Sequence, residues 1–457
     1  MPDTFSDKVK DIFGRRKIRS LEDVHLSQAF CMKPWVHLFV SHFGTVVPCC
    51  LTSWEKDQAL GDVNKQSIEE IWQGPEMQAF RRKMLRDQPD ARCHQCYQNE
   101  KLGLRSARKV VNFLYADQLD WVNATARSGF APDAKPIYWD IRFSNLCNFR
   151  CRICGHHSSS NWFDDAKAMG QVSHETRVNH GVESFDDLLG QLEVVIPDLQ
   201  ELYFAGGEPL IMEEHYKLLK HLLKRGKTDV RLRYNTNFSQ THYKGQDVFD
   251  LWNEFEDVFV HASLDGEGKR GEFQRKGQDW NQVLENRRRM REKCPQVDFL
   301  LTPTISIFNV LHLPDFHRNW TESGLIHLDE CMPHTLKQPA AYSLRVLPPP
   351  LKAEVATKLQ AHIDWIVARA KTNPPPPPPA VGNRLKERLS MIKAPHVTGH
   401  IKLDMAINEF RKCINFMNSG DDTHLLPEFR ALSAQLDTLR EENTQETFPE
   451  LAPLFVE

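Results

Sequence analysis

The sequence predicts an α/β protein with three parts: a cysteine-rich N-terminal domain at 1–130, a partial (β/α)6 barrel at 131–345, and a helical C-terminal region at 346–457. Three observations predict this organisation. Cysteines are grouped near the N-terminus, strand-like and helix-like blocks alternate through the middle of the chain, and helical patterns prevail beyond it. A chain of 457 residues is also too long for one simple core, because domains usually hold about 150 residues.

The composition is that of an ordinary soluble globular protein, with 40% apolar and 26% charged residues. No apolar run is long enough to span a bilayer, and the charged N-terminus lacks the apolar stretch of a signal peptide. We therefore expect a cytoplasmic protein with no membrane partner. A net charge of -3 argues against nucleic acid as the main partner, because phosphate binding requires clustered positive charge.

The cysteine-rich domain begins with two short β-prone runs, at 35–40 and 45–47, which predict a hairpin. A helix is expected to start at Ser67, because Ser67 and Glu70 have the spacing of a capping box before an apolar face. A second amphipathic helix is expected at 77–85.

The middle of the chain alternates between strand-like and helix-like blocks, as in folds with a parallel sheet. Helical blocks are expected at 185–195 and 215–224, among others. The expected strands are Ile137–Phe143, Glu201–Phe204, Val230–Tyr234, Val258–Leu264, Phe299–Ile305 and Leu325–Asp329. Six such units would form a partial, open barrel whose chemistry lies just after the strands.

The C-terminal region is expected to be helical at 351–370 and 405–417. Between these helices, Pro374–Pro379 form an uninterrupted proline run. Such a run adopts the extended polyproline II conformation, which favours a stiff spacer. The alternative is a ligand for a proline-binding domain.

The first group of candidate ligands is Cys147, Cys151 and Cys154, in a loop after the first expected barrel strand. Soft thiolates favour zinc or an iron–sulfur cluster. Three ligands leave one coordination position open, as in catalytic metal sites. The alternative is a zinc site that His156 or His157 completes.

The spacing Cys-x3-Cys-x2-Cys resembles the cluster motif of radical S-adenosylmethionine (radical SAM) enzymes, although Ile153 stands where the family usually has an aromatic residue. The resemblance implies a 4Fe–4S cluster whose open iron binds the amino and carboxylate groups of S-adenosylmethionine. It also implies that the backbone near Ile153 meets the adenine. Reductive cleavage of the cofactor would then give methionine and a 5'-deoxyadenosyl radical that abstracts hydrogen from a substrate.

A second motif, Gly206-Gly207-Glu208-Pro209, directly follows an expected strand. Glycines allow a backbone to approach a ligand closely, and a carboxylate accepts hydrogen bonds from an ammonium group. On its own this is a common turn. In this order along the chain it resembles the family's GGEP motif, which holds the methionine amino group.

Polar residues after the next two strands resemble positions that bind the ribose and carboxylate of the cofactor. Individually they are ordinary turn formers and helix caps. They are Asn235, Asn237, Ser263 and Asp265.

The N-terminal group has enough thiolates for a closed zinc site or a fully ligated cluster. Its members are Cys31, Cys49, Cys50, Cys93 and Cys96. Their setting resembles the SPASM and twitch auxiliary-cluster domains of the same superfamily, which usually follow the barrel but here precede it. The resemblance implies a single twitch-like 4Fe–4S cluster on Cys31, Cys93, Cys96 and one of Cys49 or Cys50.

We therefore expect a radical SAM enzyme, with oxidoreductase chemistry as one option, that acts on an unidentified peptide or small molecule. An electron donor such as flavodoxin or ferredoxin would reduce its cluster. The alternatives are a zinc-binding structural or interaction protein and a radical SAM methyl or methylthio transferase. The sequence identifies no catalytic residue beyond the cofactor and metal sites.

Overall fold

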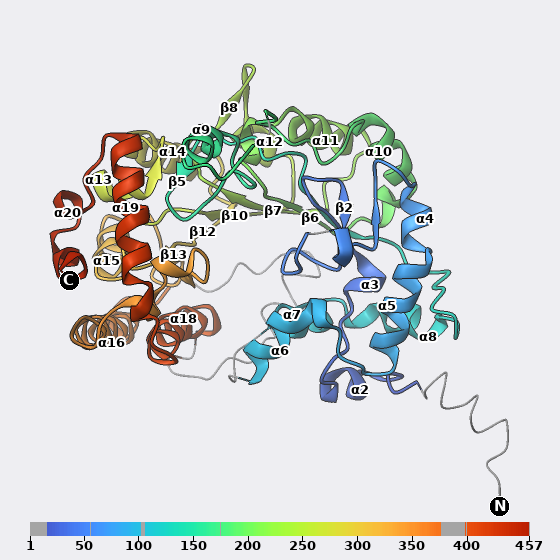
Figure 1. The fold of residues 1–457 in the computed structure, drawn as a ribbon. Coiled ribbons are helices and arrows are strands. Elements are labelled where there is room, and N and C mark those ends of the chain that lie inside the picture. Colours follow the sequence, from blue (N-terminus) through green and yellow to red (C-terminus); the bar gives the residue numbers. More distant parts are fainter. Residues whose placement is uncertain are drawn as a thin grey trace, which may run out of the picture. The chain divides into compact units, whose positions relative to one another are not determined.

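The computed structural model describes residues 16–54, 56–101, 106–173, 175–375, 398 and 400–456 (Figure 1). Its contacts define two compact units, each built from separate segments of the chain. The first unit comprises Met1–Ser144, His180–Phe204 and Lys220–Val230, and the second comprises Asn145–Asn179, Ala205–Leu219 and Arg231–Glu457. The domain boundaries predicted from the sequence stay a prediction.

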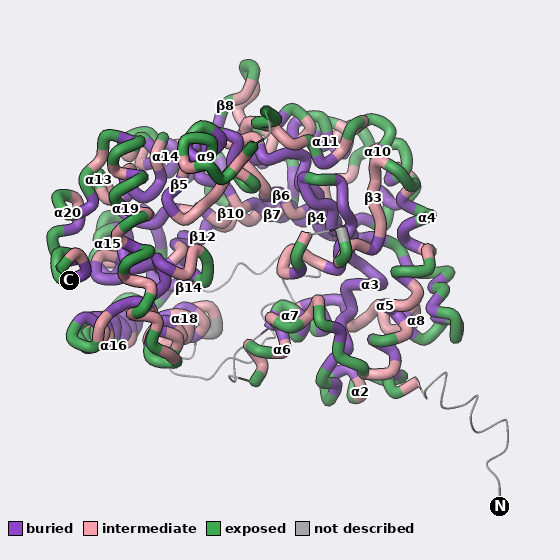
Figure 2. Tube along the Cα trace, in the orientation of Figure 1, coloured by how far each residue is buried: buried purple, intermediate pink, exposed green. Residues whose placement is uncertain are grey.

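The first unit contains a mixed set of strands. Its members are β1 (His37–Val40), β2 (Thr45–Val46), β3 (Gly61–Asp62), β4 (Tyr138–Ile141) and β6 (Glu201–Phe204). Strand β4 pairs in parallel with both β1 and β6, whereas β2 is antiparallel to β1 and to β3. All residues of β1 and β4 are buried, as the purple tube of β4 shows in Figure 2. Continuous burial is typical of parallel strands that are covered on both faces.

The N-terminal hairpin is confirmed, with Val40 opposite Val46. Its first strand starts two residues later than predicted. Pro34 occupies the first turn of a short helix, α3 (Lys33–Val36), where its fixed φ angle suits helical geometry. Trp35 therefore lies in this helical turn.

Helices cover the strands of the first unit. They are α2 (Leu21–Leu26), α4 (Ile68–Trp72), α5 (Pro75–Leu85), α6 (His94–Lys101), α7 (Ala107–Leu114), α8 (Leu119–Ala124) and α10 (Phe185–Leu192). The predicted start at Ser67 is confirmed, because its hydroxyl accepts from the Glu70 N–H while the Glu70 carboxylate accepts from the Ser67 N–H.

The second unit contains three parallel strands, β7 (Arg231–Thr236), β10 (Asp257–Ala262) and β12 (Asp298–Leu301). Along β7 and β10 buried and half-buried residues alternate, which places one half-open face on these strands (Figure 2). Connecting helices are α11 (Glu213–Lys224), which belongs partly to each unit, α12 (Val248–Trp252), α13 (Gly268–Gln274), α14 (Trp280–Lys293) and α15 (Leu313–Glu322).

The strand predicted at Leu325–Asp329 is wrong, because these residues form turns. Helix α15 ends in a Schellman motif: Gly324 has φ +70°, its N–H donates to the Thr321 carbonyl, and the Leu325 N–H donates to the Trp320 carbonyl. The apolar Leu325 belongs to this helix end. Extended pairing starts later, with a parallel bridge from Cys331 to Leu301. The strand β14 (His334–Thr335) follows and is parallel to β13 (Thr304–Ile305).

Both predicted C-terminal helices are confirmed, as α16 (Pro349–Thr372) and α18 (Ile401–Asn418), which lie side by side in Figure 1. The chain adds α19 (Leu426–Arg440) and α20 (Thr444–Thr447). Most of the predicted proline spacer, Pro376–Pro379, lies outside the described residues. No helix in the described part of the chain is both long and apolar enough to cross a membrane.

Candidate functional site

The loop that carries Cys147, Cys151 and Cys154 is held in place by backbone contacts within the second unit. The Cys154 N–H donates to the Cys151 carbonyl (3.0 Å), and the indole N–H of Trp162 donates to the same carbonyl (2.6 Å). A short strand in the loop, β5 (Arg150–Cys151), pairs with β11 (Arg275–Lys276). The loop is thus an ordered part of the fold.

Burial raises the pKa of these thiols. The pKa of Cys151 rises to about 12, although the nearby guanidinium of Arg275 opposes the rise. Burial raises the pKa of Cys147 and Cys154 as well. Thiolate is the ligand form, so a bound metal must displace these protons.

The Gly206–Glu208 turn lies directly against the chain that leads into the cysteine loop. Gly206 has φ +104°, and a Cβ on Gly207 would stand 2.0 Å from the Leu146 carbonyl oxygen. The Glu208 N–H donates to that same carbonyl (2.7 Å). Both glycines are therefore required, one for its backbone angle and the other for the close approach. The structure brings the two motifs together.

The Glu208 carboxylate is 1% exposed and binds the end of strand β7. It accepts hydrogen bonds from the Thr236 hydroxyl (2.6 Å), the Asn237 N–H (2.6 Å) and the Leu210 N–H (3.1 Å). Burial raises its pKa to about 7, even though these donors favour the charged form. The carboxylate is buried and oriented, a state in which an ammonium partner would bind it strongly.

Two of the polar strand-end residues lie beside this network. The Asn237 amide donates to the Asn148 side chain (2.8 Å), which joins β7 to the cysteine loop. The Ser263 N–H donates to the Thr236 carbonyl (2.8 Å). Asn235 is half-buried and, one residue before Thr236, points to the opposite face of the strand. Asn237 and Ser263 are thus brought to the loop and Glu208, whereas Asn235 belongs to the half-open face.

Asp265 has protein partners of its own. Its carboxylate forms a buried ion pair with Arg275 (2.8 Å) and accepts the Thr304 N–H (2.8 Å). Arg275 in turn lies 3.7 Å from the Cys151 sulfur. Asp265 therefore reaches the cysteine loop through an arginine that the sequence analysis missed. Ile153 is half-buried between the second and third cysteines.

The C-terminal helix α19 also contacts the cysteine loop, and the sequence analysis missed this contact. Leu436 on α19 packs with Trp162 in a buried cluster against which Cys154 lies. Arg440, at the end of α19, forms a buried ion pair with Asp165 (2.8 Å). Arg152 of the loop forms ion pairs with Asp437, which lies in α19, and with Glu442, which lies just beyond it. The loop is therefore enclosed by residues from far along the chain.

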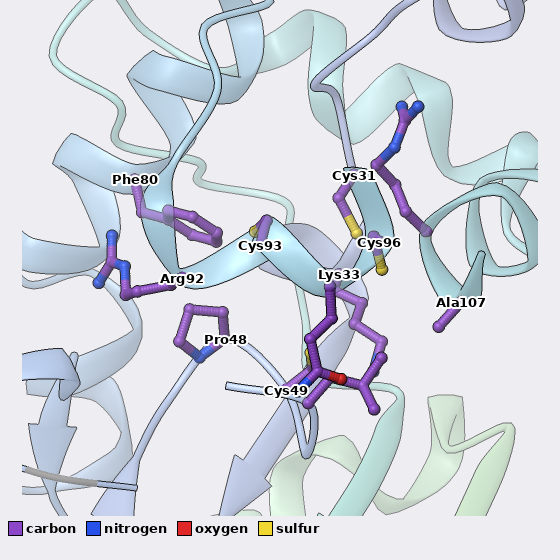
Figure 3. A pocket seen from close by; sticks show the side chains of 12 residues that line it. Cys31, Lys33, Pro48, Cys49, Phe80, Arg92, Cys93, Cys96 and Ala107 are labelled. Atoms are coloured by element: carbon purple, nitrogen blue, oxygen red, sulfur yellow. The ribbon is translucent and has the colours of Figure 1, made fainter. Parts of the chain in front are cut away.

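Four N-terminal cysteines line one pocket in the first unit: Cys31, Cys49, Cys93 and Cys96. Figure 3 shows their thiols gathered around one space. Cys31 precedes α3, and Cys49 follows β2. Cys93 ends a 3-10 turn just before α6, and Cys96 lies in the first turn of α6. Four soft ligands are the donor set of a fully ligated cluster.

Lys33 lines the same pocket and fits a negatively charged group there (Figure 3). The residue is 8% exposed, and no Asp or Glu among the described residues forms an ion pair with it. Burial alone would lower the pKa of Lys33, but the surrounding cysteine charges, above all Cys49, raise it. A buried cation needs an anionic partner, and ligated thiolates would supply one.

Cys50 does not line this pocket. Its environment instead includes Asp140 and Arg142, which form an ion pair of 2.7 Å at strand β4. Burial raises the pKa of Cys50 to about 11, with Lys33 opposing the rise. Of the two adjacent cysteines left open by the sequence, the geometry favours Cys49 as the fourth ligand.

Among the described residues, no three His, Cys, Asp or Glu side chains meet where one metal ion would bind. That finding concerns a single ion. The thiolates of a four-iron cluster each bind a different iron atom, so the two cysteine groups match the cluster's donor set.

Comparisons with known protein families identify both regions. Residues 31–97 match the iron–sulfur cluster-binding domain SPASM, and residues 141–307 match the radical SAM superfamily. The two matched regions are therefore a domain of the radical SAM type and, ahead of it, an iron–sulfur cluster-binding domain. The chain thus contains a radical SAM domain, and its SPASM domain lies ahead of that domain in the sequence. The expected order of the two regions is confirmed.

Several solved structures show a weak likeness to the chain. They include native anSMEcpe with bound AdoMet and Cp18Cys peptide (18% identity, 51% of this chain and 60% of that chain, TM-score 0.36), native anSMEcpe with bound AdoMet (18%, 50% and 60%, 0.36) and TYW1 with a lysine–pyruvate adduct (11%, 49% and 70%, 0.27). The chain spans about 60% of the anSMEcpe structures. At these TM-scores we infer nothing from the likeness. Among curated proteins, no relative matches the chain.

Proposed function

We propose that this enzyme cleaves S-adenosylmethionine reductively at a 4Fe–4S cluster on Cys147, Cys151 and Cys154, and so starts hydrogen abstraction from a peptide or small-molecule substrate. One observation carries the proposal: the Gly206–Glu208 turn lies against the residue that precedes Cys147. When bound, the reduced cluster supplies the electron for this cleavage. We further propose a partial α/β barrel for residues 131–345, which the parallel strands within each unit support. Its sixth strand is not the one predicted from the sequence at Leu325–Asp329.

The chain's own residues would orient the cofactor. The Glu208 carboxylate, fixed by Thr236 and Asn237, would accept a hydrogen bond from the methionine amino group. Asn237 and Ser263, which are hydrogen-bonded to Asn148 and Thr236, would contact the rest of the cofactor. The backbone at Ile153 would meet the adenine. Asn235 lies on the half-open face of β7, opposite to the face of Thr236, and would contact the cofactor only from that face. Asp265 would act through Arg275 rather than directly.

The SPASM region would hold one auxiliary 4Fe–4S cluster, ligated by Cys31, Cys49, Cys93 and Cys96. The shared pocket and the buried charge of Lys33 support this ligand set. A fully ligated cluster has no iron free for the cofactor, so its role would be to pass electrons. If the auxiliary cluster accepts an electron from a substrate radical, the reaction would be a dehydrogenation or a cross-linking. Flavodoxin or ferredoxin would donate the electron that reduces the cluster on Cys147, Cys151 and Cys154.

Product analysis tests the proposed reaction. Protein loaded with iron and sulfide under anaerobic conditions is incubated with S-adenosylmethionine and dithionite, and nucleoside products are separated. We expect absorbance near 400 nm and formation of 5'-deoxyadenosine. S-adenosylhomocysteine as the main product would instead indicate methyl transfer, and a colourless zinc protein would indicate a structural role.

Glu208→Gln is expected to weaken S-adenosylmethionine binding roughly ten- to a hundredfold, because a charge-assisted hydrogen bond contributes about 1.5–3 kcal/mol. Glutamine keeps the shape of the site, although its NH2 group cannot accept a hydrogen bond and so leaves the donors on one side without an acceptor. Glu208→Ala would leave the Thr236, Asn237 and Leu210 donors all without one. Equilibrium dialysis of iron-loaded protein measures the affinity, and iron content should stay unchanged. Equal affinity in both proteins would remove Glu208 from the site.

The affinity of the parent protein should also depend on pH. With a pKa of about 7, Glu208 gains a proton and loses its charge as the pH falls through that value. Binding of an ammonium group should therefore weaken from about pH 8 to about pH 6 in the parent. The affinity of Glu208→Gln should lack this part of the pH dependence, because glutamine does not titrate. The comparison of the two dialysis series isolates the carboxylate from other titrating groups.

Cys49→Ala is expected to lose the auxiliary cluster, about four irons per chain, whereas Cys50→Ala should keep it. The reason is that Cys49 shares the pocket with the other three cysteines and Cys50 does not. Iron and sulfide analysis after anaerobic loading measures the difference, and each variant is the matched control of the other. Loss of iron from Cys50→Ala alone would reverse the assignment.

A further inference from the structure

Arg275 is delivered to the cysteine loop by strand pairing. In the antiparallel pair β5–β11, Arg275 stands opposite Cys151, and the next residue of the loop, Arg152, donates its N–H to the Gln274 carbonyl (2.8 Å). The Arg275 side chain is buried, and its Nη1 lies 3.7 Å from the Cys151 Sγ. This is within hydrogen-bond distance for a sulfur acceptor.

The other edge of the guanidinium is fixed by Asp265. Arg275 Nε lies 2.8 Å from an Asp265 oxygen, and the second oxygen of that carboxylate accepts the Thr304 N–H. The planar guanidinium is thus held between a carboxylate on one side and a sulfur on the other. Its positive charge is closer to Cys151 than the balancing negative charge is, because the guanidinium stands between them.

We propose that Arg275 sets the reduction potential of the cluster on Cys147, Cys151 and Cys154; this inference rests on the proposed function. One-electron reduction by a low-potential donor adds one negative charge to the cluster. A hydrogen bond to a ligand sulfur and a nearby positive charge both stabilise that added charge. The effect is strengthened by burial, because the low dielectric of the interior screens the charge weakly.

Two other buried arginines lie near the loop: Arg152, which pairs with Asp437 and Glu442, and Arg440. The Nε and Nη2 of Arg440 both bind one oxygen of Asp165, at 2.9 and 2.8 Å, and Arg150 binds the other oxygen of that carboxylate. Arg275, by contrast, contacts a ligand sulfur directly. It is therefore the residue to test.

The midpoint potential, read from the paramagnetic resonance signal during a redox titration without S-adenosylmethionine, tests the inference. The titration uses the full-length Cys93→Ala/Cys96→Ala protein as background, so that a single cluster gives the signal. Arg275→Gln should lower the midpoint potential by at least about 59 mV. This shift corresponds to a tenfold smaller equilibrium constant for one-electron reduction of the cluster. Arg275→Lys keeps the charge and should lower it less.

A second variant tests whether a shift in potential comes from an unpaired buried charge. Arg275→Gln leaves Asp265 buried without its cation, whereas Arg275→Gln with Asp265→Asn removes both charges and should also lower the potential. Arg287→Gln is the matched control, because Arg287 is a buried arginine of the same unit whose partners are Leu325 and Glu330. It should leave the potential unchanged.

Two outcomes overturn the inference. An unchanged potential in iron-replete protein of both the single and the double Arg275 variants would show that Arg275 does not tune the cluster. An equal fall in Arg287→Gln would show that any buried arginine matters. Failure of the folded background protein and of the parent protein to assemble a cluster would instead overturn the proposed function, and the inference with it.

Discussion

Replacing Cys147, Cys151 and Cys154 together by alanine is expected to abolish 5'-deoxyadenosine formation and to lower iron from about eight to about four atoms per chain. The reason is the number of ligands. Three thiolates leave one iron of a four-iron cluster open for the cofactor, whereas four close it. Iron count and nucleoside yield are measured on the same anaerobically loaded sample.

The matched control for this triple variant is Cys294→Ala, since Cys294 is a buried cysteine of the same unit outside both groups. It should keep all iron and full 5'-deoxyadenosine yield. If the triple variant still forms 5'-deoxyadenosine, cofactor cleavage takes place elsewhere in the chain and the assignment of the open iron is wrong.

Replacing Cys93 and Cys96 by alanine is expected to remove about four irons and to stop substrate turnover, while unproductive cleavage of S-adenosylmethionine continues. Both residues line the N-terminal pocket, and cofactor cleavage needs only the cluster with the open iron. The same loss should leave Lys33 buried without anionic partners, which destabilises the first unit. Iron content, 5'-deoxyadenosine yield and thermal unfolding are compared with the parent.

The outcomes of this double variant separate two ideas. If it retains all its iron, there is no cluster on the proposed N-terminal ligands. If it stays folded and keeps the barrel cluster but loses cofactor cleavage, the two clusters are coupled and the division of roles is wrong.

Local patterns carried most of the fold prediction. The cap at Ser67 and the strand Glu201–Phe204 depend on neighbours in sequence, and both are found at the predicted positions. The strand predicted at Leu325–Asp329 failed for a physical reason: Gly324 ends helix α15 in a left-handed conformation, and the N–H of the apolar residue after it bonds back to the helix. An apolar run after a helix-ending glycine resembles a strand in sequence.

Parts of the candidate site depend on contacts between distant segments, which the sequence does not show. Arg275 reaches Cys151 only because β11 pairs with β5, and Arg440 reaches the same loop from the C-terminal helix. Cys49 and Cys50 are neighbours in sequence, so the sequence cannot distinguish their roles. In the structure Cys49 lines the pocket and Cys50 does not. The cysteine motifs could be recognised, but the charges around them could not.

The central claim is that the three-cysteine loop holds a cluster with one iron open to the cofactor. The most direct measurement is the paramagnetic resonance spectrum of the reduced Cys93→Ala/Cys96→Ala protein, recorded with and without S-adenosylmethionine. We predict that the cofactor changes the spectrum, because its amino and carboxylate groups would bind the open iron. An intense cluster signal that is identical with and without saturating S-adenosylmethionine would contradict the claim.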